Sequence, residues 1–397
     1  MPLILKFVRH SLPEFLRRNF ERFDFVLLAL IILMCACGIV VLGSATRVDL
    51  NGHGGLYLKQ VMWAGTGFAL LLFASMIDYH FICKLAPPIY IFNIILLTLV
   101  LFFIGDGTRG VDRWIQIGHG SGAVKIQPSE FSKLFMIISV SAFLAAADEE
   151  INRPKCLIPA LLGIVVPVGL VYLQPSLSAA AVVFAASAFI VFSSKVSYKN
   201  ILIIIACVLS LLAVLYVDFN TERRLILTKV MHMQPYQLDR IELLIDPSSD
   251  PDKSRQTVMS TYAIGSGQLY GKGMYKSSQG RYTADNQNDF IFTVLGEEFG
   301  FVGCTAVLAL MFLIILKCLR VASRAVDPLG RFIALGTAAM FFTQSFFHVG
   351  VTTGILPNTG VTFPFFSYGG SSMWTCMAAA GMVINVGKAR KKGMFID

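Results

Sequence analysis

Residues 25–45 read FVLLALIILMCACGIVVLGSA, a stretch without a charged side chain. Such a run is long enough to cross the hydrocarbon core of a bilayer, which takes about 20 helical residues. Similar runs recur, and the same hydropathy criterion predicts a bundle of about ten transmembrane helices with a large loop between spans 7 and 8. The predicted spans are residues 25–45, 56–76, 88–104, 131–147, 157–172, 177–192, 201–217, 290–317, 332–351 and 365–386. The sequence therefore predicts an all-α integral membrane protein.

The composition agrees with a chain that faces lipid. Of its 397 residues, 55% are hydrophobic and only 14% are charged, whereas about a quarter are charged in soluble proteins. The net charge of +9 would suggest nucleic-acid binding in a soluble protein. Here much of the basic charge lies beside predicted spans, so we expect membrane lipids and no nucleic acid as partners. The eight cysteines lie mostly in apolar runs and contain no CxxC pair, so we expect no disulfide framework.

Basic residues also predict the topology. Ten spans place both termini on one side, together with the basic loops 195–199 and 317–331 and the KARKK tail at 388–392. Cytoplasmic segments are enriched in Lys and Arg, so this side should be the cytoplasm. No small-residue cleavage pattern follows the first apolar run, and we expect that span to be retained.

We divide the chain into three parts. Residues 1–24 alternate basic and apolar side chains, as does a cytoplasmic helix lying in the membrane interface; a disordered tail that only supplies positive charge is the alternative. Residues 25–386 form the transmembrane domain and include a large extracellular loop at 218–289, while 387–397 form a basic cytoplasmic tail. Loops of this length are usually functional or disordered. Apolar stretches and Asp-Pro turns within it predict partial order.

Two ionisable residues open the fourth span. Glu130 and Lys133 are three residues apart and share a helix face. Pro128 should lie just outside the helix, with Ser129 as its cap. One interpretation is local capping with an ion pair; the other is a polar wall of a cavity that opens outward, because ionisable groups at membrane depth are often functional.

A second group of carboxylates lies where the large loop enters the eighth span. Asp289 is placed to be partly desolvated yet open to water, as suits a general base; a helix N-cap is the alternative. Glu297 and Glu298 follow about two turns later. Being adjacent, they cannot both face the same way on a helix. At least one should turn into the bundle or reach the outer interface, unless a basic residue pairs with it.

Two glycine-rich segments complete the candidates. Residues 265–273 contain four glycines and Lys272, a backbone that can approach a phosphate closely, although a flexible loop is the default interpretation. The spacing is not that of a P-loop. Residues 367–372, SYGGSS, open the last span, where they permit either close helix packing or an irregular helix start that lines a cavity.

These segments, in this order, resemble the SEDS family of shape, elongation, division and sporulation proteins, of the RodA, FtsW and SpoVE type. The resemblance covers most of the chain. It is carried by Arg113-Trp114, Gln127–Glu130 with Lys133, Gln174-Pro175, Arg240, Asp246-Pro247, 263–267, 271–273, 288–292, Glu297-Glu298, Gly300, 354–357, Thr359-Gly360 and 364–371. Each motif is weak alone, but the ordered set is specific.

The resemblance implies an enzyme of the bacterial cytoplasmic membrane. Family members join lipid II units into glycan strands outside the membrane and work with a class B penicillin-binding protein, a transpeptidase. The family's essential aspartate maps onto Asp289, which would act as general base. Basic residues, or a divalent cation such as Mg or Mn, would neutralise the leaving pyrophosphate; no organic cofactor is expected. The residues expected to contact substrate are Arg113, Trp114, Glu130, Lys133, Arg240, Lys272, Ser367 and Tyr368.

The chain also departs from the family pattern. Ser176 stands where Asp is usual, His348 where Asn is common, and residues 254–256 and 283–287 replace two further motifs. A specialised or weakly active paralogue would show such changes. Two other functions stay open at this point: a transporter that flips a lipid-linked precursor across the bilayer, and a non-catalytic scaffold for the transpeptidase.

Overall fold

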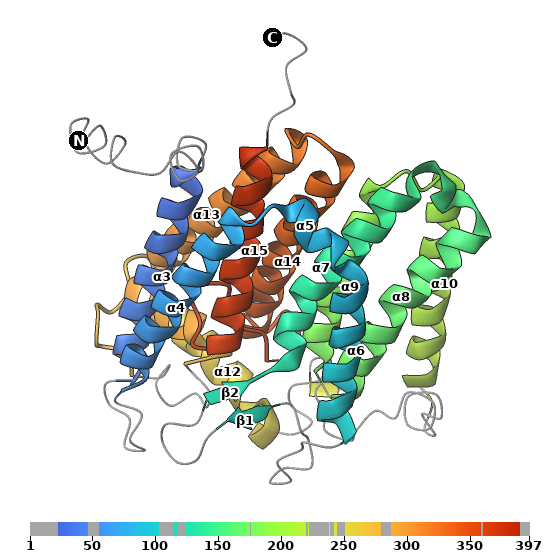
Figure 1. The fold of residues 1–397 in the computed structure, drawn as a ribbon. Coiled ribbons are helices and arrows are strands. Elements are labelled where there is room, and N and C mark those ends of the chain that lie inside the picture. The colour runs from blue at the N-terminus through green and yellow to red at the C-terminus, as the bar shows by residue number, and fades with distance from the viewer. Residues whose placement is uncertain are drawn as a thin grey trace, which may run out of the picture.

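The computed structural model describes residues 23–46, 55–102, 114–117, 124–174, 176–219, 221, 238, 242–243, 251–278, 287–358 and 360–389. Within these residues the protein is a bundle of helices with one short β-hairpin (Figure 1). Seven of the helices are long and apolar enough to cross a membrane. The expectation of an all-α integral membrane protein is confirmed.

Each of the ten expected spans contains a helix. These helices are α3 (Phe25–Thr46), α4 (Leu56–Met76), α6 (Ala86–Phe102), α7 (Pro128–Ala147), α8 (Pro154–Leu173), α9 (Leu177–Ser193), α10 (Tyr198–Phe219), α13 (Ile291–Ser323), α14 (Pro328–Thr352) and α15 (Gly370–Lys388). The helices α6 and α9 are apolar but shorter than the rest. Helix α15 is less apolar because almost all of it is buried by protein and not by lipid.

Smaller elements lie at the two ends of the bundle. At one end are the short helix α5 (Tyr79–Lys84) and the 3-10 helix η2 (Asp148–Asn152). At the other end are the antiparallel strands β1 (Ile115–Ile117) and β2 (Val124–Ile126) and the helix α12 (Pro251–Ser266) (Figure 1). The ammonium of Lys388 lies 4.9 Å from the centre of the Phe23 ring. The first span therefore begins at the same end of the bundle at which the last span finishes, as an even number of crossings requires.

Helices α4 and α15 pack closely along the middle of the bundle. A Cβ atom at Gly381 would collide with the carbonyl oxygen of Leu71, and one at Gly67 would lie 3.0 Å from Met377. Small residues at such positions let two helix backbones approach, which stabilises helix pairs within a membrane. In contrast, α10 has a single buried residue, Asp218, and lies at the edge of the bundle (Figure 1).

Helix α13 is broken at Gly300, whose backbone angles of φ 63° and ψ −160° are not helical. Residues 267–273 fill the break. On one side, the carbonyls of Glu297 and Glu298 accept 3.0 Å hydrogen bonds from amides of this segment. On the other side, the amide of Phe301 donates a 2.8 Å hydrogen bond to a carbonyl of the same segment. The backbone groups that the break leaves without helical partners are thereby satisfied, as burial requires.

This arrangement explains the glycines of residues 267–273. A Cβ atom at Gly267 would collide with the carbonyl of Gly296, and one at Gly271, where φ is +79°, would collide with the backbone of Glu298. The segment is therefore a close-packed backbone insert and not the flexible loop that the sequence alone suggested as the default.

Helix α12 is attached to the transmembrane helices through a buried hydroxyl. Ser260 shares a hydrogen bond with Thr293 in the first turn of α13 and donates a 2.7 Å hydrogen bond to the carbonyl of Thr352 at the end of α14. Part of the large loop is thus ordered and packed on the membrane domain.

Candidate active site

Asp289 lies in a turn immediately before α13 and is half-buried. The N-cap residue of this helix is Phe290, which forms no side-chain hydrogen bond with the helix end. The alternative interpretation, in which Asp289 occupies the N-cap position, is therefore wrong. Its carboxylate lies beside Gly360, where φ is +71° and a Cβ atom would be only 3.1 Å from Asp289 Oδ2. Glycine at this position leaves room for the carboxylate.

Residues 363–369, which we call the support loop, hold the turn that carries Asp289. Ser367 Oγ donates a 2.9 Å hydrogen bond to the carbonyl of Asn288, and the amide of Tyr368 donates a 3.1 Å hydrogen bond to the preceding carbonyl. Ser367 Oγ also accepts from a main-chain amide of the support loop itself. Two of the residues expected to contact substrate, Ser367 and Tyr368, are thus brought to the segment of Asp289. The Ser367 hydroxyl forms its hydrogen bonds with main-chain groups there.

Glu130 and Lys133 form an ion pair inside the bundle. Lys133 Nζ lies 2.7 Å from Glu130 Oε1, and the two side chains are 2% and 9% exposed, lysine first. The expected shared helix face is confirmed. Because an unpaired charge at this depth would be costly, the pair is a strong structural requirement, and its contact with substrate stays a prediction.

The start of α7 differs from the expected cap. The N-cap residue is Gln127, Pro128 is already inside the helix, and Ser129 is buried within the first turn. The prediction that Ser129 caps this helix is wrong, because proline lacks an N–H and has a fixed φ that suits the first helical position. The amide of Gln127 donates a 3.0 Å hydrogen bond to Ser371 Oγ. The first residues of α15 and the N-cap of α7 are joined by this contact.

Lys272 neutralises a buried carboxylate at the break in α13. Its Nζ lies 2.6 Å from Oε1 of Glu297, whose side chain is fully buried, and the hydroxyl of Ser278 donates to the same oxygen. The adjacent Glu298 is also buried and accepts a 2.5 Å hydrogen bond from Ser44 on α3. Both glutamates turn into the protein, as was expected of at least one of them, and the alternative expectation of a basic partner is met at Glu297 by Lys272. A role of Lys272 toward a pyrophosphate stays a prediction, and its ammonium already holds Glu297.

The remaining predicted residues are described only in part. Trp114 is 41% exposed beside the start of β1. Arg113 and Arg240 lie outside the described residues, as do Pro175 and residues 283–286. Their expected roles stay predictions.

Two of the described positions of departure from the family pattern are buried. Ser176 is buried at the N-cap of α9, and its carbonyl accepts a helical hydrogen bond. His348 is fully buried in α14, and its Nδ1 lies 2.6 Å from the carbonyl oxygen of Val361. His348 therefore holds the chain just before the support loop.

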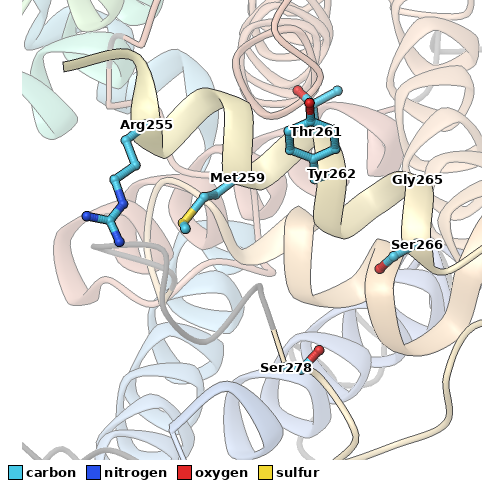
Figure 2. A pocket seen from close by; sticks show the side chains of 7 residues that line it. All are labelled: Arg255, Met259, Thr261, Tyr262, Gly265, Ser266 and Ser278. Atoms are coloured by element: carbon cyan, nitrogen blue, oxygen red, sulfur yellow. The ribbon is translucent and has the colours of Figure 1, made fainter. Parts of the chain in front are cut away.

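A cavity of about 610 Å³ lies along α12, on a face of the helix other than that of Ser260 (Figure 2). Arg255 stands at one end of it, Met259 and Tyr262 follow along the helix, and Ser266 and Ser278 lie at the other end. The sequence reasoning noted Arg255 only as a departure from the family pattern. The spacing of these α12 residues at three or four positions is the signal that places them on one face.

Comparison with known proteins gives this architecture a family. A family model for cell cycle proteins of the FtsW, RodA and SpoVE type matches residues 24–392. The chain belongs to the FtsW/RodA/SpoVE family. It is 31% identical over 388 residues to the probable peptidoglycan glycosyltransferase FtsW of Trichlorobacter lovleyi, covering 95% of this chain and 97% of that one. It is 32% identical to the peptidoglycan glycosyltransferase MrdB of Escherichia coli K12, covering 93% and 94%.

A solved structure is similar over almost the whole chain. It belongs to work described as "Structural coordination of polymerization and crosslinking by a peptidoglycan synthase complex", and the match has a TM-score of 0.73 at 28% identity, covering 92% of this chain and 97% of that one. The resemblance found in the sequence motifs is thus confirmed, and this member of the FtsW/RodA/SpoVE family is a multi-pass membrane protein.

The described residues contain no group of three or more His, Cys, Asp or Glu that could hold a metal ion. All eight cysteines lie among them and are free. Mg²⁺ is commonly bound by one or two carboxylates together with substrate phosphates and water. The half-buried carboxylate of Asp289 fits a cation shared with a substrate in this way, whereas a cage made by the described residues alone does not fit.

Proposed function

We propose that this protein is a peptidoglycan glycosyltransferase that polymerises lipid II on the outer face of the bacterial cytoplasmic membrane. The names of its FtsW and MrdB relatives support the activity. The observation that carries the proposal is the state of Asp289. Asp289 is half-buried at the end of the bundle opposite to Phe23 and Lys388, it lies just before the N-cap residue of α13, and a separate loop holds its backbone.

The reaction follows from this position. A sugar hydroxyl of one lipid II attacks the anomeric carbon of another lipid-linked glycan, a new C–O bond forms, and the bond to the polyprenyl pyrophosphate breaks. Asp289 takes the proton of the attacking hydroxyl as the new bond forms. The bundle holds the lipid tails in the membrane, and the reacting ends are thereby kept together. A divalent cation would neutralise the negative charge that develops on the leaving pyrophosphate.

The proposed orientation places both termini in the cytoplasm. Basic residues at that end of the bundle support it; Lys84, Lys155 and Arg331 lie in the terminal turns of helices, and Lys195 lies between α9 and α10. A class B penicillin-binding protein is the proposed partner. The similar structure from a peptidoglycan synthase complex, described in terms of polymerisation and crosslinking, supports such a pairing.

The test compares wild type, Asp289→Asn and Asp78→Asn, each purified as the full chain together with its co-expressed transpeptidase. Asparagine keeps the shape of the side chain but cannot accept a proton. We expect Asp289→Asn to lower the rate of lipid II polymerisation by about 100-fold or more. Asp78→Asn makes the same chemical change at the other end of the bundle, at an exposed helix cap, and should leave the rate unchanged. Removal of divalent cations by a chelator, followed by adding back Mg²⁺ or Mn²⁺, tests the cation in the same assay.

The alternatives give different outcomes. Undiminished product from Asp289→Asn would overturn the assignment of this residue as the base. Movement of labelled lipid II across proteoliposome membranes that Asp289→Asn leaves unchanged, without any polymer, would indicate a transporter. Restoration of growth by Asp289→Asn in a deletion strain would indicate a scaffold.

A further inference from the structure

Helix α4 reaches the support loop through one buried amide. The side chain of Gln60 is 1% exposed, although it lies in an apolar span. Its Nε2 donates a 3.0 Å hydrogen bond to the carbonyl of Ser367, and its Oε1 accepts a 3.3 Å hydrogen bond from the amide of Gly369. Both ends of the amide are therefore used on the same short stretch of main chain. The orientation of the amide follows, because a carbonyl needs a donor and an N–H needs an acceptor.

The next turn of α4 fixes the same stretch by packing. The Trp63 ring packs so closely on Gly370 that a Cβ atom there would be only 3.0 Å from the ring. The same ring packs edge-on against Trp374, with ring centres 5.3 Å apart. Gln60 and Trp63 are three residues apart and share a helix face. The outer part of α4 thus forms a rigid support on which the start of α15 lies.

The support loop transmits this position to the turn of Asp289. Ser367 is held by Gln60 through its carbonyl, and its hydroxyl donates to the carbonyl of Asn288. The amide of Tyr368 donates to the carbonyl that precedes Asn288. Ser367 alone therefore links Gln60 to the backbone next to Asp289, since its carbonyl binds Gln60 and its hydroxyl binds the carbonyl of Asn288.

We infer that Gln60 is a positioning residue for Asp289. It does not touch the reacting atoms. It holds the support loop in place, and the support loop sets the position and orientation of the Asp289 carboxylate. The inference rests on the proposed function of Asp289 as general base. Because a displacement of about 1 Å at a reacting group can lower a rate about 100-fold, a loosened loop should slow the chemical step more than it weakens binding of the substrate.

The chain offers a matched control. Asn385 is a buried amide that also joins α4 to α15, but at the other end of the bundle. Its Nδ2 donates a 2.8 Å hydrogen bond to the carbonyl of Ser75, and its Oδ1 accepts a 3.0 Å hydrogen bond from the amide of Tyr79. Each amide can be replaced with an apolar side chain of similar size, in Gln60→Met and Asn385→Leu. The first change removes the partners of the Ser367 carbonyl and the Gly369 amide. The second removes the partner of the Tyr79 amide, whereas the Ser75 carbonyl still accepts a 2.9 Å hydrogen bond from Lys388 Nζ. Both variants should be destabilised, and they differ in their relation to Asp289.

The experiment measures kcat and KM for lipid II, with the thermal unfolding midpoint, for the full chain purified with its transpeptidase. We expect Gln60→Met to lower kcat by about 10- to 100-fold with a nearly unchanged KM, at a temperature at which the variant is folded. Asn385→Leu should also lose thermal stability but show a nearly unchanged kcat. Equal losses of kcat in the two variants would make Gln60 merely structural and overturn the inference.

A second variant covers the case in which Gln60→Met does not fold. Ser367→Ala removes the hydrogen bond to Asn288 one step closer to Asp289 and should also lower kcat. Where both variants fold, the fold-decrease in kcat of the double variant should be smaller than the product of the two single fold-decreases, because both residues act through the same loop. A fold-decrease equal to that product would contradict the inference. Where only Ser367→Ala folds, an unchanged kcat would contradict it.

Failure of the inference and failure of the proposed function give different results. A wild-type rate in Asp289→Asn would refute the proposed function itself. A lost rate in Asp289→Asn, together with a wild-type kcat in Gln60→Met, would refute only the role of Gln60.

Discussion

Replacing Lys133 with methionine should destabilise the protein far more than the loss of an ordinary ion pair. The ammonium lies 2.7 Å from Glu130 Oε1, and both side chains are almost completely buried. At an effective dielectric constant of 20, two unit charges at this distance attract by about 6 kcal/mol, much of which offsets the cost of removing them from water. Within the described residues, Glu130 Oε2 has no hydrogen-bond partner. No second donor there replaces Lys133, so Lys133→Met should cost about 3–5 kcal/mol.

The bundle contains a control with the same sequence spacing. Arg153 and Glu150 are also three residues apart and 3.1 Å from each other, but their side chains are 71% and 64% exposed. Arg153→Met should therefore cost less than about 1 kcal/mol. The measurement is the free energy of unfolding of each purified variant in detergent, by denaturant titration. The double variant Glu130→Gln with Lys133→Met should recover part of the loss, because no charge then stays buried alone. A loss in Lys133→Met no greater than that in Arg153→Met would refute this reasoning.

Two further changes test other parts of the bundle. Gly271→Ala should disrupt the insert in the break of α13, because its methyl group would collide with main-chain atoms. The methyl group of Gly273→Ala meets only a flexible side chain at 3.5 Å, and this variant should lose only about 1–2 kcal/mol of stability. The yield of folded protein after purification should therefore be lower for Gly271→Ala than for Gly273→Ala. At the opposite end, His80 lies 2.8 Å from Asp78 and 2.9 Å from Asp327. Burial lowers the pKa of His80, but its hydrogen bond to Asp78 and the two carboxylate charges outweigh burial and raise the pKa above 6.5. This contribution to stability is complete below about pH 6.5 and is lost as the pH rises through the raised pKa, and His80→Gln should remove that dependence from the unfolding midpoint measured against pH.

The membrane spans could be predicted from the sequence because hydropathy is a local property. Helix α4 begins and ends at the predicted residues, and α3 differs by one residue. The ion pair between Glu130 and Lys133 was also accessible, since helix periodicity alone places the two side chains together. The error at Ser129 was local too. The fixed φ of Pro128 favoured the first helical position over the position outside the helix.

Features that depend on distant segments could not be predicted in this way. Gly300 is one glycine in a long apolar run, and only the insertion of residues 267–273 turns it into a break. Gln60 is a lone amide in an apolar span, and its partners lie about 300 positions later in the sequence. Asp289 was identified from its place before the eighth span and from the family motif. The loop that holds it could not be predicted, because the hydroxyl of Ser367 and the amide of Tyr368 bind main-chain carbonyls, and such acceptors leave no trace in the side-chain pattern.

The break in α13 divides the eighth span into two parts that share one attachment. The inserted backbone segment, residues 267–273, forms hydrogen bonds with carbonyls of residues 291–299 and with amides at the start of residues 301–323. Asp289 lies just before the first part, and the second part is also anchored at its far end, where Lys317 pairs with Asp24 at 3.0 Å. Because the segment belongs to the large loop, a displacement of this loop would reach the turn of Asp289 and the remainder of the span together.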